Sequence, residues 1–227
     1  MIVRLTIANI AFALFLSGLT LSSAPAQPAP AQEQSARDLN LKGVQLQSQG
    51  KLAEAAEDYR KAIQINQNGA AYHNNLALVL KDMDQLDEAE QEAKVALKLR
   101  PKRPDYHCNL GIVLMREKKP ALAEQQFREA VSLDAMDTES HYRLAQALKD
   151  TEKLSDAEQE IKLALMLKPD NLEYHQLFGD ILLQQKREEE ALNEYHRASG
   201  GPKGTMSGEL RSKIDYLQQV LKSRQHG

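Results

Sequence analysis

A pair of alanines seven residues apart occurs five times in this chain, and each pair lies 34 residues after the one before. The five pairs are Ala55 and Ala62, Ala89 and Ala96, Ala123 and Ala130, Ala157 and Ala164, and Ala191 and Ala198. A fixed period of this length is typical of stacked repeats, in which one unit cannot bury its apolar face alone and packs on the next. The spacing therefore predicts a stack of equal units as the core of the fold.

Three further columns of residues follow the same period. The first column is a small residue that precedes each alanine pair. The second is a leucine three residues after that small residue. The third lies sixteen residues after the small residue, between the two alanines of the pair. These columns are Gly43, Ala77, Gly111, Ala145 and Gly179; Leu46, Leu80, Leu114, Leu148 and Leu182; and Tyr59, Ala93, Phe127, Ile161 and Tyr195. Spacings of three, four and seven residues are those of an α-helix. These spacings therefore predict that each unit contains two helices separated by a short break.

The expected helices span 37–49 and 52–65, 70–82 and 86–99, 104–117 and 120–133, 138–151 and 154–167, and 172–185 and 188–199. Packed helix axes lie about 8–10 Å apart, so a small residue at the crossing makes room for a bulky side chain from the partner helix. Helices this short are marginal when isolated in water. We therefore expect the stack to supply the stability that the single helices lack.

The repeat resembles the tetratricopeptide repeat. The segment from Ala70 to Pro101 carries that family's pattern, and Pro104 to Ala135 carries it nearly as well. The resemblance implies an all-α, right-handed α-solenoid of five helix-turn-helix repeats at 36–69, 70–103, 104–137, 138–171 and 172–205. The departures lie at the ends of the array, at Lys42 in the first repeat and at Glu188, Gly201 and Lys203 in the fifth.

A further helix is expected in residues 206–227, after the breaker Gly200-Gly201-Pro202. Its apolar residues share one side: Leu210, Ile214, Leu217, Val220 and Leu221. The last apolar surface of a repeat stack has to be covered, so we interpret this segment as a C-terminal capping helix. The alternative is an amphipathic helix for a partner or a membrane surface.

Residues 1–26 differ from the rest of the chain. A basic start with Arg4 precedes an uncharged, mostly apolar stretch from Leu5 to Leu21, and Ala24-Pro25-Ala26 has the form of a cleavage site. This pattern indicates a secretory signal peptide, followed by a Pro/Gln-rich linker at 27–35, and predicts a periplasmic or secreted protein. The alternative is an uncleaved membrane anchor, for which the stretch is weak beside the roughly 20 apolar residues that span a bilayer.

Composition and motifs argue against several classes of function. The formal net charge of −3 gives no electrostatic reason to expect a nucleic acid as partner, which leaves a nucleic-acid-binding helical repeat as the least favoured hypothesis. The sequence holds no phosphate-binding glycine loop, zinc-protease or serine-hydrolase motif. We therefore predict no enzyme activity, no catalytic residue and no cofactor.

Four histidines also recur at the repeat period: His73, His107, His141 and His175. Equivalent side chains on neighbouring units lie about a helix spacing apart, whereas a zinc ion needs nitrogens about 2 Å away. We therefore interpret them as packing residues between helices and expect no metal site. Cys108 is the single cysteine, so it can form no internal disulfide; we expect a small packed residue, with a redox or intermolecular role as the alternative.

The resemblance also implies where a partner would bind, because the first helices of tetratricopeptide arrays line a concave groove that receives a peptide. The candidate groove residues are Asn74, Asn75, Leu78, Asn109, Ile112, Tyr142, Arg143 and Gln146. Asn75, Asn109 and Arg143 occupy equivalent places in successive repeats. An asparagine amide can both donate to and accept from a peptide backbone, and some family members use such a ladder. The alternative is a solvated polar face.

The sequence as a whole thus predicts an exported protein-interaction scaffold that binds a peptide segment of a partner in this groove. A membrane-tethered assembly or docking factor, held by an uncleaved leader, is the alternative. Contact with a membrane is expected only in that second case.

Overall fold

The computed structural model describes residues 29–200 and 207–225, which form eleven α-helices and contain no strand. The predicted signal peptide lies outside these residues. The helices are α1 (Pro30–Ser48), α2 (Leu52–Ile65), α3 (Ala70–Asp82), α4 (Leu86–Leu99), α5 (Pro104–Arg116), α6 (Pro120–Leu133), α7 (Thr138–Asp150), α8 (Leu154–Leu167), α9 (Leu172–Gln184), α10 (Glu188–Ala198) and α11 (Gly208–Gln225).

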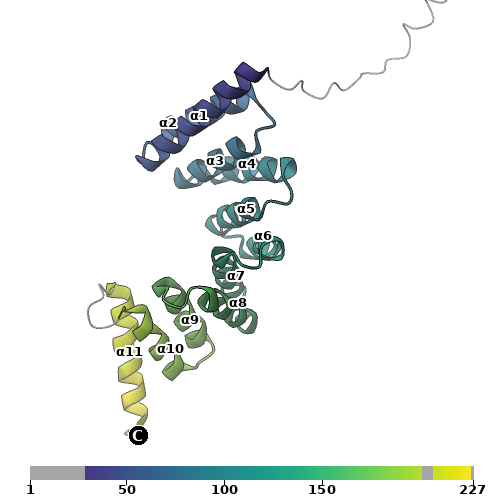
Figure 1. Ribbon diagram of the computed structural model, residues 1–227. Coiled ribbons are helices and arrows are strands. Elements are labelled where there is room, and N and C mark those ends of the chain that lie inside the picture. Colours follow the sequence, from purple (N-terminus) through teal and green to yellow (C-terminus); the bar gives the residue numbers. More distant parts are fainter. Residues whose placement is uncertain (1–28, 201–206, 226–227) are drawn as a thin grey trace, which may run out of the picture.

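The helices pack as five successive pairs, α1 with α2 through α9 with α10, and each pair contacts the next (Figure 1). The pairs follow one another along an open arc rather than closing into a bundle. Leu210, Ile214 and Leu217 of α11 are buried, and α11 packs against α10. The predicted helical solenoid and its capping helix are therefore confirmed.

The first helix begins earlier than the sequence predicts. Expected at residue 37 after an extended linker, α1 instead begins at Pro30. Proline suits the first helical position because its missing N–H needs no partner there, and the Ala29 N–H donates to Gln32 Oε1 at 3.1 Å. Glu33 accepts a hydrogen bond from the side chain of Asn66. The second half of the predicted linker is thus the first two turns of a helix fastened to the end of α2.

In three of the helix pairs a glycine of the first helix faces an aromatic ring of the second. A Cβ atom added to Gly111 would lie 2.5 Å from the Phe127 ring, and one added to Gly43 would lie 2.6 Å from the Tyr59 ring. Gly179 stands in the same relation to Tyr195. Where the first helix carries alanine instead, at positions 77 and 145, the second helix carries the smaller aliphatic residues of positions 93 and 161. The size of one side chain is therefore matched to the space left by the other.

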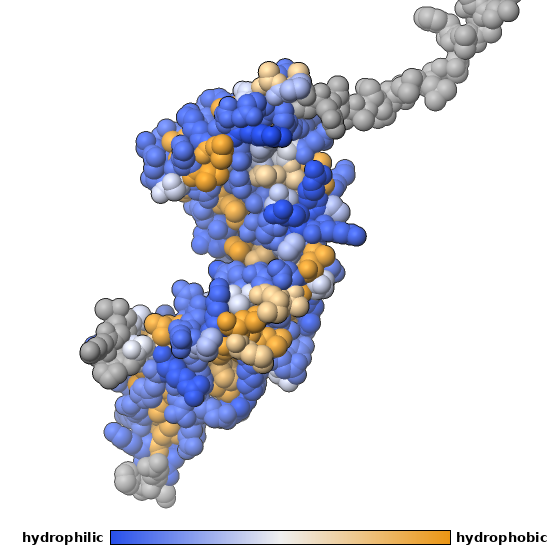
Figure 2. All heavy atoms as spheres, viewed as in Figure 1, coloured by the Kyte–Doolittle hydropathy of each residue, from blue (hydrophilic) through white to orange (hydrophobic). Residues whose placement is uncertain are grey.

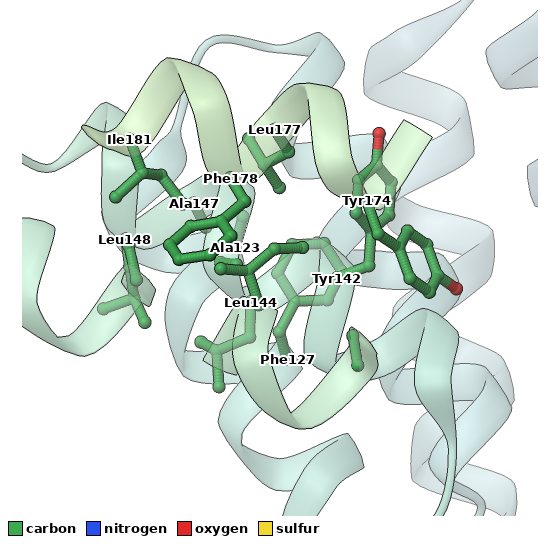
Figure 3. Packing of buried hydrophobic residues seen from close by; sticks show 14 of the residues in the cluster. Ala123, Phe127, Tyr142, Leu144, Ala147, Leu148, Tyr174, Leu177, Phe178 and Ile181 are labelled. Atoms are coloured by element: carbon green, nitrogen blue, oxygen red, sulfur yellow. The ribbon is translucent and has the colours of Figure 1, made fainter. Parts of the chain in front are cut away.

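The apolar core runs continuously from one repeat into the next. One cluster of buried residues extends from Ala77 in α3 to Leu217 in α11. Figure 3 shows part of it, where Phe127 of α6, Leu144 of α7 and Phe178 of α9 lie together. Because neighbouring repeats share this cluster, the apolar face of each repeat is covered by the next.

The turn inside each repeat is built the same way five times. The residues at its left-handed position are Gly50, Asp84, Lys118, Glu152 and Lys186, with φ between 59° and 75°. The following N–H donates to the carbonyl of the leucine five residues earlier, as from Lys119 N to Leu114 O at 2.9 Å. This is a Schellman motif. Four of the five positions are not glycine, so the sequence indicated this turn only at Gly50.

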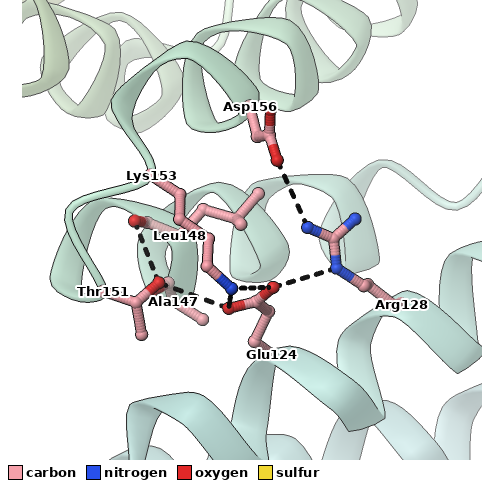
Figure 4. A network of polar contacts seen from close by, with 7 residues as sticks. All are labelled: Glu124, Arg128, Ala147, Leu148, Thr151, Lys153 and Asp156. Carbon is pink, nitrogen blue, oxygen red and sulfur yellow. Dashed lines mark hydrogen bonds and ion pairs between the residues drawn. The ribbon is translucent and has the colours of Figure 1, made fainter.

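A row of carboxylates joins neighbouring repeats. Glu124 of α6 is buried, and both its oxygens lie 2.8 Å from Lys153 Nζ in the turn of the next repeat. Arg128 Nε donates to it at 3.0 Å, and the Thr151 hydroxyl contacts it too (Figure 4). Burial raises the pKa of Glu124, but the bonds from Lys153 and Arg128 outweigh burial and leave that pKa lowered. Glu90 and Glu158 make equivalent pairs, with Lys119 and with Arg187.

We predict that Gly111→Ala lowers the free energy of unfolding by about 1–3 kcal/mol, because the added methyl group overpacks the contact with Phe127. Chemical denaturation or calorimetry measures the change. Gly208→Ala is the matched control, since nothing lies within 4 Å of a Cβ atom there.

The double variant Gly111→Ala/Phe127→Ile copies the alanine and isoleucine found at positions 145 and 161. We expect it to be at least as stable as Gly111→Ala alone. A double variant in which the two losses simply add would contradict the size-matching account.

Candidate functional site

The first helices of the repeats form one continuous surface, which we call the inner face: α1, α3, α5, α7 and α9. Each of the first four contacts the first helix of the next repeat. Within the described part of the chain, contacts between successive second helices are sparse or absent. This closer approach bends the stack toward the inner face, on the inside of the arc in Figure 1. The expectation that first helices line a concave surface is therefore correct.

The asparagines of the inner face bond to one another across repeats. Asn75 Nδ2 donates to Asn40 Oδ1 at 2.9 Å, and Asn109 Nδ2 donates to Asn74 Oδ1 at the same distance. Asn75 and Asn109 are half-buried, while Asn74 is only 7% exposed. The predicted ladder is thus a row of amide pairs, and Asn74 is a supporting residue with little surface of its own. Because the two members lie 35 residues apart, one more than the repeat, the columns did not reveal the pairing.

These pairs also hold neighbouring repeats together. A hydrogen bond of this kind contributes about 1 kcal/mol to stability. Replacing Asn75 or Asn109 would therefore disturb the junction between repeats as well as the surface. Neither asparagine is a clean probe of binding.

An aliphatic row runs beside the amide pairs. Val44, Leu78 and Ile112 hold the same position in α1, α3 and α5. Val44 is 45% exposed, and Leu78 and Ile112 are half-buried. Leu41 of α1 is 60% exposed on the helical turn before Val44. The N-terminal part of the inner face therefore offers apolar and amide groups.

The C-terminal part of the inner face is more polar. Arg143 Nε donates to Glu139 Oε1 at 2.6 Å, and its Nη1 donates to Gln146 Oε1 at 3.1 Å. Gln146 Nε2 in turn donates to the Tyr142 hydroxyl at 2.9 Å. The structure thus brings three predicted groove residues, Tyr142, Arg143 and Gln146, into one network on α7.

An open pocket of about 310 Å³ lies beside this network, between α7 and α9. Its lining residues are Tyr142, Gln146, Lys149, Glu173, Gln176, Leu177 and Asp180. The rings of Tyr142 and Tyr174 stack with centroids 4.9 Å apart. Lys149 and Glu173 are charged lining residues that the sequence analysis did not place in the groove. Asp180 is also bonded to Lys213 Nζ of the capping helix at 2.7 Å, which ties the cap to the inner face.

The recurring histidines lie between helices, as the sequence predicts. Each ring contacts a side chain of the second helix of its own repeat, for example His73 Nδ1 to Glu92 Oε2 at 2.6 Å. Cys108 is buried, and burial raises the pKa of its thiol to about 11, in keeping with a packing role. Among residues 29–200 and 207–225 no cluster of His, Cys, Asp or Glu is arranged to hold a metal ion.

No helix within residues 29–200 or 207–225 combines the length and the apolar character needed to cross a bilayer. The apolar stretch from Leu5 to Leu21 lies outside this part of the chain.

Three family models for tetratricopeptide repeats match the chain, over residues 43–84, 74–138 and 114–181. Together they extend from the first helix pair into the fifth. A comparison with curated proteins gave no match.

Solved structures share the fold at low sequence identity. PilF of Pseudomonas aeruginosa is 20% identical and has a TM-score of 0.74, over 86% of this chain and 88% of PilF. MamA of Desulfovibrio magneticus RS-1, starting at its residue 41, is 20% identical with a TM-score of 0.69, over 76% of this chain and 98% of that one. YrrB, described as a TPR protein with an unusual peptide-binding site, is 20% identical with a TM-score of 0.64, over 84% and 93% of the two chains.

Proposed function

The chain belongs to the tetratricopeptide-repeat family, and we propose that it is an exported scaffold that binds an extended segment of a partner protein along its inner face. The observation that carries this proposal is the lining of α1, α3 and α5, where amide pairs run beside an aliphatic row. Such a surface can bond to a peptide backbone and at the same time receive apolar side chains.

The amide pairs suit a peptide backbone. An asparagine side chain has two N–H donors and an oxygen with two lone pairs, and the pairing uses one N–H of Asn75 and one of Asn109. Neighbouring helices lie about 8–10 Å apart, and an extended chain advances about 3.3 Å per residue. One amide pair would therefore meet every third residue of an extended ligand, whatever its side chain.

The aliphatic row adds selectivity. Val44, Leu78 and Ile112 recur at the same helix spacing, so they favour a ligand with apolar side chains about three residues apart. The charged pocket between α7 and α9 would receive a polar continuation of the same segment, near Lys149 and Glu173. The surface therefore supports a ligand that is apolar at one end and polar at the other.

The other functional classes find less support. The net charge of −3 opposes a nucleic-acid partner. We propose no catalytic role, because the polar groups of the inner face are amide pairs and ion pairs that recur along the stack rather than a single constellation of acid, base and nucleophile.

Export rests on residues 1–26 alone. We predict that the mature protein, isolated from the extracytoplasmic fraction and sequenced from its N-terminus, begins at Gln27, because Ala24 and Ala26 form the small-residue cleavage site. A protein that retains Met1 and sediments with membranes would instead support the tethered docking factor.

The groove assignment predicts where a partner can be trapped. A photo-crosslinking amino acid placed at Val44 or Gln146 should join the chain to one segment of a partner, whereas the same group at Leu122 or Met166 should not. Those two residues are exposed on second helices, at 46% and 75%. Mass spectrometry of the adducts identifies the segment.

The trapped segment, made as a peptide, then allows binding to be measured. Val44→Glu should weaken its affinity at least about tenfold, which corresponds to about 1.4 kcal/mol. The melting temperature should stay nearly unchanged because Val44 is an exposed surface residue. Met166→Glu is the matched control, and equal loss of affinity in both variants would argue against the inner face.

A further inference from the structure

The four recurring histidines make the same two contacts in four repeats. In each, Nδ1 faces a side chain of the second helix nineteen residues later, and Nε2 faces a main-chain carbonyl six residues earlier. The Nδ1 contacts are to Glu92 at 2.6 Å, Gln126 at 3.0 Å, Glu160 at 2.7 Å and Glu194 at 2.6 Å. The Nε2 contacts are to the carbonyls of Gln67 at 3.0 Å, Pro101 at 2.9 Å, Ala135 at 3.1 Å and Pro169 at 2.8 Å.

Each histidine therefore joins three segments. It sits on the first helix of its repeat, reaches the second helix of the same repeat, and holds the loop that arrives from the preceding repeat. Residues 67, 101, 135 and 169 all lie in those connecting loops. The ring is thus placed at the junction between two units of the stack.

The proton count of the ring decides whether both contacts can be made. A carbonyl and an ionised carboxylate can only accept hydrogen bonds, and a neutral imidazole carries a single N–H. Beside Glu92, Glu160 and Glu194, both bonds can form only when the ring carries two protons. When the ring loses one of them, either the carboxylate or the loop carbonyl loses its donor.

The third repeat differs at this point. Its acceptor is Gln126, whose amide can turn so that its NH₂ group donates to His107 Nδ1 while Nε2–H still donates to the Pro101 carbonyl. A neutral His107 therefore keeps both contacts. The chain thus contains a natural control for the three glutamate repeats.

The charges around each ring are few. Among the described residues Glu92 and Glu160 form ion pairs only with their histidines, whereas Glu194 also lies 3.2 Å from Arg197 Nη1. His73, His141 and His175 are all buried. For His73, burial lowers the ring pKa, but the bonds to Glu92 and the Gln67 carbonyl outweigh it and leave the pKa raised.

We propose that three of the junctions between repeats contain proton-dependent locks, formed by His73 with Glu92, His141 with Glu160 and His175 with Glu194. Both hydrogen bonds of each lock stabilise the junction in mildly acidic solution, and one of them is lost as the pH rises. The junction at His107 and Gln126 stays fastened across the same range. The proposal concerns the stack itself and does not rest on what the inner face binds.

The locks also bear on the inner face. His73 directly precedes Asn74, which accepts the hydrogen bond from Asn109 in the next repeat. His141 likewise precedes Tyr142 of the charged pocket. Loosening a junction would therefore change the spacing of the groups that line this face.

The sign of the pH effect follows from which state holds the proton. His73, whose folded pKa is raised, contributes stability in full below its unfolded value of about 6.5, and this contribution is lost as the pH rises through the folded value. We therefore expect the melting temperature of the full chain to fall between pH 6 and pH 9. In the triple variant Glu92→Gln/Glu160→Gln/Glu194→Gln the fall should shrink to less than about half.

Two further variants sharpen the comparison. Gln126→Glu builds a fourth lock and should steepen the fall in melting temperature. Glu129→Gln removes an exposed carboxylate from the same helix as Gln126 and should leave the fall as in the wild type. The same pH dependence in the wild type, the triple variant and Gln126→Glu would overturn the proposal.

A measurement on the unaltered protein guards against effects of the substitutions on folding. In an NMR titration of the ring nitrogens, the midpoint at which His73 loses one of its two protons should lie above pH 6.5. A ring that loses one proton below that pH would also overturn the proposal.

Discussion

The close contact between the two helices of each repeat is the interaction on which the rest of the structure depends. A first-helix glycine leaves room for an aromatic ring from the second helix, as Gly111 does for Phe127, and alanine stands opposite a smaller residue in the alternate repeats. This fit brings each pair of short helices together and leaves an apolar surface on both sides of the pair. Only a neighbour can bury that surface, so the pairs stack, and α11 covers the last one.

Polar groups then determine how the pairs sit relative to one another. On the side of the second helices, the carboxylates of Glu90, Glu124 and Glu158 form ion pairs with lysine or arginine side chains of the next repeat. The amide pairs join successive first helices on the opposite side, and the histidines fasten the connecting loops. Because the backbones of successive first helices approach more closely than those of successive second helices, the stack curves and offers a long inner face. The fold thus presents as its most continuous surface the one that carries the amide and aliphatic rows.

Much of this architecture could be predicted from the sequence, because its cause is local and repeated. The leucine and alanine columns fix the helix faces within single repeats, and the expected helices end within about two residues of those observed, a normal uncertainty for helix ends. The start of α1 was missed because its first turn is held by Asn66, a contact made only after folding. The left-handed turns were missed because Asp84, Lys118 and Glu152 give no sign of positive φ in their sequence.

The candidate site was harder to predict, because it depends on the offset between neighbouring repeats. The position of Asn75 and Asn109 on the first helices could be deduced from the columns, but their partners Asn40 and Asn74 follow only from how far one hairpin slides along the next. The acceptors of the histidines likewise come from another helix and from a loop. In a stacked repeat, periodicity specifies which side of a helix a residue occupies, and packing decides what it bonds to.

If matched small and large side chains build an open stack rather than a closed bundle, the molecule in solution is elongated. Small-angle X-ray scattering on the chain from residue 29 onward tests this directly. A compact globule of this size has a radius of gyration of about 16–17 Å. The open stack should give a clearly larger radius and an asymmetric distance distribution with a long tail, whereas a radius near the compact value with a symmetric distribution would contradict the open arrangement.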